Sequence, residues 1–63
     1  MMSIIIKSMT GCLFAFYITE EYEAMSPITG ELIDLHSAPL STVHKMLKLH
    51  IVEYTSLHLS DLL

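Results

Sequence analysis

Arginine and tryptophan are absent from this sequence of 63 residues, and cysteine occurs once. The single cysteine, Cys12, excludes an intrachain disulfide, and one free thiol is typical of a protein in the reducing cytoplasm. Only three lysines supply positive charge, whereas contacts with a phosphate backbone need several cationic side chains. We therefore expect no direct binding of nucleic acid. Seven acidic residues give a net charge of −4, which favours a basic protein surface as the partner.

Long hydrophobic runs are also missing. The longest uninterrupted apolar stretch, residues 12–18, is much shorter than the roughly 20 residues that span a bilayer. The first residues lack the basic start and small-residue cleavage site of a signal peptide, because Lys7 follows three isoleucines. We expect a cytoplasmic protein that does not cross the membrane.

The chain is short for its hydrophobic content. Residues 1–63 are enough for a single small domain, and a chain of this size buries only about 60% of its unfolded surface. Small scaffolds make up the shortfall with disulfides, a metal or oligomerisation. Because 52% of the residues are hydrophobic and no disulfide can form, we expect a homodimer.

A β-hairpin over residues 14–36 is the clearest local signal. Its turn is predicted at residues 26–30, where Pro27 pre-sets φ and Gly30 supplies a positive φ for a type I turn with a bulge. The alternation of apolar residues predicts one strand over residues 12–25 and a returning strand over residues 31–36. Five of the seven acidic residues lie on this hairpin: Glu20, Glu21, Glu23, Glu31 and Asp34.

Residues 3–9 are apolar and β-branched, which predicts a further strand. Thr10-Gly11 is a candidate two-residue turn into the next strand. The alternative for residues 1–9 is an arm that docks on a partner chain.

A helix is predicted after this hairpin. Ser37 is a candidate N-cap, and Pro39 is tolerated in a first helical turn. Leu40, Val43 and Leu47 then recur at helical spacing. Lys45 and Lys48 fall late in this segment, where cations suit the negative end of the helix dipole.

The segment after Leu49 allows two structures. Its β-branched run favours a final strand over residues 51–59, which is the structure we predict. The alternative is one continuous helix, because Leu40, Val43, Leu47 and Ile51 also fit a single helical stripe that Tyr54 and Leu57 continue.

These elements predict an α+β fold, in which a small antiparallel sheet of three to four strands carries one helix on its apolar face. The expected core is Phe14, Phe16, Ile18, Ile33, Leu35, Val43 and Leu47.

Catalytic and metal-binding chemistry is not indicated. The histidines at positions 36, 44, 50 and 58 have no i, i+4 pair, so we expect no metal site and no cofactor. Asp34 and His36 with Ser41 have the residue types of a catalytic triad but lack a pocket and an oxyanion hole, so we expect no enzyme. Cys12 has no neighbouring base or cation, and we expect it to be a small buried hydrophobe.

The acidic residues on the hairpin allow two interpretations. A run of charge is usually a solvated face. Alternatively, carboxylates that repeat about every 6.6–6.8 Å along a strand imitate the spacing of successive DNA phosphates. A basic DNA-binding groove would accept such a row in place of its substrate.

Three short stretches carry a resemblance: Thr29-Gly30-Glu31, then Ile33-Asp34-Leu35-His36, then Leu40-Ser41-Thr42-Val43. Together they make a hairpin turn, a strand of the form apolar-acid-apolar-His, and a helix that opens Leu-Ser-x-apolar. Over about residues 16–49 the chain resembles the small acidic dimeric phage inhibitors of uracil-DNA glycosylase.

The resemblance implies a dimer that occupies the glycosylase's DNA groove as a DNA mimic. Asp34 would be the essential strand carboxylate, and Val43 would be the helix residue that enters the enzyme's hydrophobic pocket. The family has an aromatic residue at the position of Val43, and valine fills far less volume, so Leu40 or Leu47 could serve instead. Residues 1–9 are an additional segment.

Inhibition of a DNA-binding enzyme is thus the function we expect, with a homodimer and a basic enzyme such as uracil-DNA glycosylase as partners. The alternatives are a structural or adaptor subunit that adds a strand to a partner's sheet, or a small membrane-associated protein. The residues predicted to bind the partner are Glu23, Glu31, Asp34, His36, Leu40, Val43 and Leu47.

Overall fold

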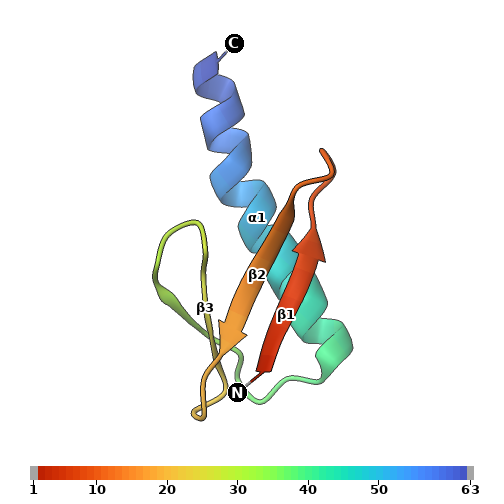
Figure 1. The fold of residues 1–63 in the computed structure, drawn as a ribbon, viewed down its shortest axis with the longest axis vertical. Helices are drawn as coiled ribbons and strands as arrows, with labels where there is room; N and C mark the ends of the chain where they lie inside the picture. The colour runs from red at the N-terminus through yellow and green to blue at the C-terminus, as the bar shows by residue number, and fades with distance from the viewer. Residues whose placement is uncertain (1, 63) are drawn as a thin grey trace.

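The computed structural model describes the backbone of residues 2–62 and the side chains of residues 2–55. Four antiparallel strands follow one another in the order β1-β2-β3-β4, and one helix lies across a single face of the sheet (Figure 1). The predicted α+β fold is confirmed. Its elements are β1 (Met2–Lys7), β2 (Leu13–Ile18), β3 (Glu23–Met25), β4 (Leu32–Asp34) and α1 (Leu40–Leu62).

The strand predicted over residues 3–9 is confirmed as β1, which pairs with β2. The turn between them has three residues rather than two. The N–H of Gly11 donates to the carbonyl of Ser8 at 3.0 Å, and the N–H of Ser8 donates to the carbonyl of Cys12 at 2.8 Å. Gly11 has a φ of 91°, so the loop is a type I turn closed by a glycine bulge.

The single strand predicted over residues 12–25 is wrong, because the chain reverses after Ile18. The N–H of Tyr22 donates to the carbonyl of Thr19 at 3.0 Å, and Thr19 donates to Glu23 at 2.8 Å. Tyr22 therefore takes the bulge position that glycine fills in the first turn, with a φ of 58°. A left-handed conformation costs a non-glycine residue about 1–2 kcal/mol. The Tyr22 hydroxyl offsets this cost by donating to the carbonyl of Ala38 at 2.7 Å.

The turn predicted at residues 26–30 is confirmed between β3 and β4. Gly30, with a φ of 75°, donates to the carbonyl of Ser26 at 3.0 Å, and Ser26 donates to Glu31 at 2.9 Å. The Ser26 hydroxyl is buried and accepts the N–H groups of Ile28 and Thr29, each at 3.1 Å. Its lone pairs are then in use, so its hydrogen points to His50 Nε2 at 2.7 Å. This bond ties the turn to α1.

Alternation along the strands gives one buried face of the sheet, and α1 covers it with Val43, Leu47 and Ile51. Five of the seven predicted core residues are buried, and Phe14 and Ile33 pack against them half-buried. The buried hydrophobic residues are Ile4, Ile6, Phe16, Ile18, Ala24, Leu35, Val43, Leu47 and Ile51.

The final strand predicted over residues 51–59 is wrong, because α1 continues to Leu62. The buried stripe of Val43, Leu47 and Ile51 has strict i, i+4, i+8 spacing, and no glycine or proline interrupts it. Burial of this stripe outweighs the β propensity of the segment, since propensity differences are only tenths of a kcal/mol per residue.

The start of α1 also differs from the prediction. The N–H of Val43 donates to the carbonyl of Pro39 at 3.0 Å, so Pro39 occupies the N-cap and Ser37 does not. Ser37 instead lies in a turn with a φ of 53°. Lys45 and Lys48 lie at least 14 residues before the end of the longer helix, too far from it to interact with the dipole there.

Replacing Ser26 by alanine tests the bond between the turn and the helix. Ser26→Ala removes the acceptor of two N–H groups and leaves His50 Nε2 without its partner. We expect the free energy of unfolding to fall by about 1–3 kcal/mol, measured by urea denaturation. The matched control is Ser41→Ala on the exposed surface of α1, which should change stability by less than about 0.5 kcal/mol. Equal effects of the two substitutions would contradict this role of Ser26.

Candidate functional site

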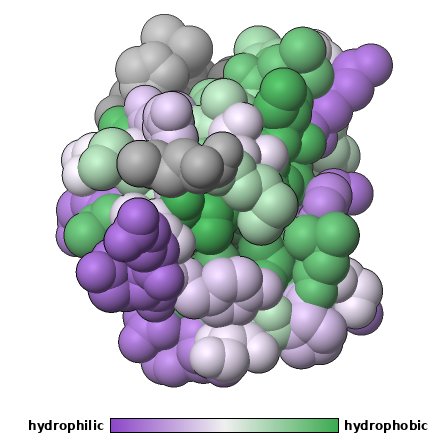
Figure 2. Space-filling view, turned by 60° about the horizontal axis from the view of Figure 1, so that its bottom comes forward, coloured by the Kyte–Doolittle hydropathy of each residue, from purple (hydrophilic) through white to green (hydrophobic). Residues whose placement is uncertain are grey.

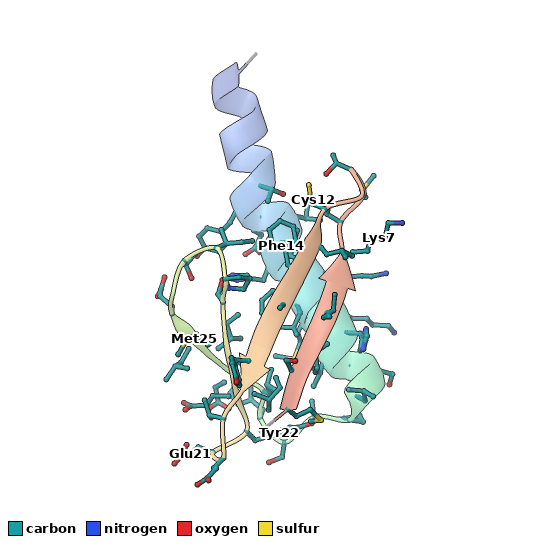
Figure 3. The ribbon with its side chains drawn as sticks, in the orientation of Figure 1. Lys7, Cys12, Phe14, Glu21, Tyr22 and Met25 are labelled. Carbon is teal, nitrogen blue, oxygen red and sulfur yellow. The ribbon has the colours of Figure 1, made fainter. Side chains whose placement is uncertain are left out.

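Carboxylates gather at one end of the sheet. Glu23 is the direct cross-strand partner of Asp34 in the β3–β4 register. Glu20 and Glu21 lie in the turn that precedes β3, at the same end of the sheet, where Figure 3 labels Glu21. We call these four residues the acidic end.

A local turn holds the Asp34 carboxylate. Its Oδ1 accepts the N–H of His36 at 2.8 Å, and its Oδ2 lies 3.6 Å from His36 Nδ1. His36 and Ser37 both have a φ of 53°, and the N–H of Ala38 donates to the carbonyl of Leu35 at 2.9 Å, as in a type I′ turn. The backbone bond fixes one carboxylate oxygen, while the side chain stays 64% exposed.

The placement of Glu23 opposite Asp34 has an energetic cost. Like charges directly opposite one another in an antiparallel pair destabilise it by about 0.2–1 kcal/mol. One lysine is on β1 and two are on α1, and within the described residues none of them forms an ion pair with Glu23 or Asp34. A cationic group placed near both carboxylates would relieve this repulsion.

The face of the sheet opposite α1 is uncovered and largely apolar. Tyr17, Met25 and Leu32 are neighbours across β2, β3 and β4, and they are 54%, 45% and 51% exposed. In the space-filling view, hydrophobic side chains (green) form a band across the molecule, with hydrophilic ones (purple) gathered beside it (Figure 2). We call this the outer face: Ile5, Leu13, Ala15, Tyr17, Met25 and Leu32.

The acidic end and the outer face form one surface. Glu23 and Met25 are two residues apart on β3, and Leu32 and Asp34 are two apart on β4, so each pair projects from the same side. A partner that touches the carboxylate pair therefore also meets an apolar row about 7 Å away.

The predicted partner-binding residues are divided by the structure. Glu23 and Asp34 are brought together, whereas Glu31 lies at the other end of β4. His36 and Leu40 are exposed close to where α1 begins.

Val43 and Leu47 are corrections to the predicted site. Both have no exposed surface, because they form the helix side of the core, and a residue without exposed surface cannot enter a pocket of a partner. The outer-face residues Met25 and Leu32 were missed because the strand over residues 12–25 was predicted without a break. The predicted turn at residues 26–30 joins β3 to β4. Counting outward from it in both directions pairs Met25 with Leu32, which would have identified both residues.

Residues with catalytic or metal-binding chemistry are dispersed. His36 is exposed, and His50 is half-buried, bonded to Ser26 and packed between Phe16 and Tyr54. Within the described residues no group of three or more His, Cys, Asp or Glu side chains is placed to hold a metal ion. His58 lies outside the described side chains. Cys12, which we expected to be buried, is exposed at the β1–β2 turn, because this residue lies before β2 begins.

Comparison with known proteins gives no match to this chain among protein-family models, curated proteins or solved structures. Within the described part of the chain, no helix combines the length and the apolar character needed to cross a membrane.

Removing one of the two facing charges tests the energetic cost of the acidic end. We expect Glu23→Gln to raise the free energy of unfolding by about 0.2–1 kcal/mol, because it removes the repulsion with Asp34. Urea denaturation at low salt measures the change, which should shrink as salt screens the charges. Glu53→Gln, at an exposed carboxylate on α1, is the control and should be neutral. A loss of stability in Glu23→Gln would contradict this account.

Proposed function

We propose that this protein is a non-catalytic DNA mimic that inhibits a DNA-binding enzyme, with uracil-DNA glycosylase as the first target to test. The observation that supports the proposal is the Glu23–Asp34 pair, two carboxylates held opposite one another beside an exposed apolar row. The sequence resemblance described above names the enzyme.

Electrostatics favours a basic groove as the surface that the acidic end would contact. Four carboxylates at one end of a chain with net charge −4 give a concentrated negative field. Such a field increases the rate of association with a positive cleft and loses strength with ionic strength. The fixed carboxylate of Asp34 would make the central contact, and Glu20, Glu21 and Glu23 would surround it.

The outer face would supply the apolar contact of this complex. The resemblance implied that Val43 had this role, but its side chain is buried. Tyr17, Met25 and Leu32 are on the same surface as the acidic pair and are about half exposed. Aromatic and methionine side chains are enriched in protein interfaces relative to the rest of the surface. We assign the hydrophobic contact with the enzyme to this row.

The exposed edge of β1 supports a second candidate function. β1 pairs only with β2, so one side of its six residues has no strand beside it in the described chain. A long apolar edge strand is a template for strand addition. The protein would then be a structural or adaptor subunit that extends the sheet of a partner.

The inhibitor proposal is tested with glycosylase activity on a uracil-containing oligonucleotide while the protein is titrated in. Asp34→Asn keeps the oxygen that accepts the His36 N–H, so the turn should be preserved while the charge is lost. Truncating one partner of a desolvated charge pair costs about 2–5 kcal/mol, so inhibition should weaken by about 30-fold or more. Glu53→Gln is the matched control and should inhibit like the unmodified protein.

Salt and stoichiometry decide between the two functions. Added salt should slow formation of the complex, since steering is screened over about 10 Å at 0.1 M. If a stoichiometric amount of the unmodified protein leaves the cleavage rate unchanged, the inhibitor proposal is wrong, and strand addition through β1 becomes the proposal to pursue.

A further inference from the structure

A groove of about 750 Å³ lies between the β1–β2 hairpin and the second half of α1. Figure 3 labels Lys7, Cys12 and Phe14 on its hairpin side. Apolar side chains dominate its lining, which also includes two of the three lysines and, among the side chains that the structure describes, no acidic residue. In a chain with net charge −4, this composition favours an occupant that is apolar and negatively charged.

The end of α1 extends beyond the sheet. Twenty-three helical residues extend about 34 Å, whereas the six-residue strands β1 and β2 extend about 20 Å. In Figure 1 the end of α1 projects past the β1–β2 hairpin. The last buried residue of the helix stripe that the structure describes is Ile51, and Tyr54 is already 42% exposed.

The exposed area and the radius of gyration are both larger than those of a compact domain of this size. A compact monomer of 7.1 kDa is expected to expose about 4,100 Å², and this chain exposes 4667 Å². Its radius of gyration is 11.9 Å, against about 10.6 Å for a compact domain of this length. The chain therefore exposes roughly 570 Å² more than a compact monomer of its mass.

The end of α1 has the charge that the groove favours. The C-terminus of a helix carries a partial negative charge, and the last turn of α1 contains no basic residue to balance it. No lysine follows Lys48 in the sequence, whereas Glu53 and Asp61 do. The end of α1 is therefore negatively polarised, and a nearby cationic side chain would stabilise it.

We infer that a second copy of this chain occupies the groove, with the second halves of the two α1 helices antiparallel about a two-fold axis near Thr55. Lys48 and Leu62 are each seven residues from Thr55, so the axis brings Lys48 of one copy level with the helix end of the other. Lys48 of one copy stays about 20 Å from Lys48 of the other, because fourteen helical residues separate the two positions. A closed two-fold pair fills both grooves at once.

This dimer is independent of the proposed function. The groove lies at the β1–β2 turn, and the acidic end lies at the β2–β3 turn, at opposite ends of β2 (Figure 1). Both acidic ends of the dimer remain free to contact other molecules.

Disulfide trapping tests the axis. Cys12 is exposed and is first replaced by serine. In the Cys12→Ser background, Thr55→Cys places a thiol at the axis, where two Cα atoms within about 4.4–6.8 Å of one another allow a disulfide. Glu53→Cys, two positions away on the opposite side of α1 from the groove, is the matched control. We expect Thr55→Cys to form the covalent dimer at least about tenfold faster under mild oxidation; equal rates would overturn the inference.

Sedimentation equilibrium tests the charge contact without an introduced cysteine. The unmodified protein should be a dimer, and Lys48→Glu should raise its dissociation constant by about tenfold or more. Lys45→Glu reverses a lysine on the same helix that does not line the groove, and it should leave the dimer intact. A monomer at all concentrations would overturn the inference and assign the groove to another anionic occupant, such as a fatty acid or an acidic peptide.

Discussion

A sheet of four strands has two faces, and this chain has one helix to cover them. The contact of Val43, Leu47 and Ile51 with the buried face of the sheet is therefore the interaction on which the rest of the structure depends. It accounts for the core, for the straight continuation of α1, and for the apolar face that remains open on the other side. Because the core is formed on one face of the sheet, side chains on the other face are not required for folding and are free to contact another molecule.

Two polar bonds decide how the hairpins sit on that core. The Tyr22 hydroxyl ties the β2–β3 turn to the backbone just before α1, and the Ser26 hydroxyl ties the β3–β4 turn to His50. Both bonds join a turn to the helix region, and both are partly shielded from water. A hydrogen bond in such a setting contributes about 0.5–1.5 kcal/mol, a large share of the stability of so small a domain.

The sequence predicted the inward and outward faces of the sheet well, since alternation in residues 12–18 and 31–36 needs only the period of a strand. It did not predict the reversal at Tyr22, because that turn contains neither glycine nor proline and depends on a hydroxyl bond to Ala38, sixteen residues away. The helix beyond Leu49 was missed for a similar reason. Local propensity favours a strand there, whereas burial of Ile51 against the sheet favours a helix. The Glu23–Asp34 pair was not predicted, because it depends on the register between β3 and β4. Without the β2–β3 turn, β3 was not recognised as a separate strand.

The order of the elements also affects how the chain is made. All four strands precede α1, so the sheet can form hairpin by hairpin from neighbouring segments, which is a rapid route to structure. Until α1 has been synthesised, however, both faces of that sheet are bare. At about 5–20 residues per second, the 23 residues of α1 take about 1–5 s to be synthesised. During that interval no helix covers the sheet, so its isoleucine-rich first strand and both of its faces are most open to aggregation before α1 is made.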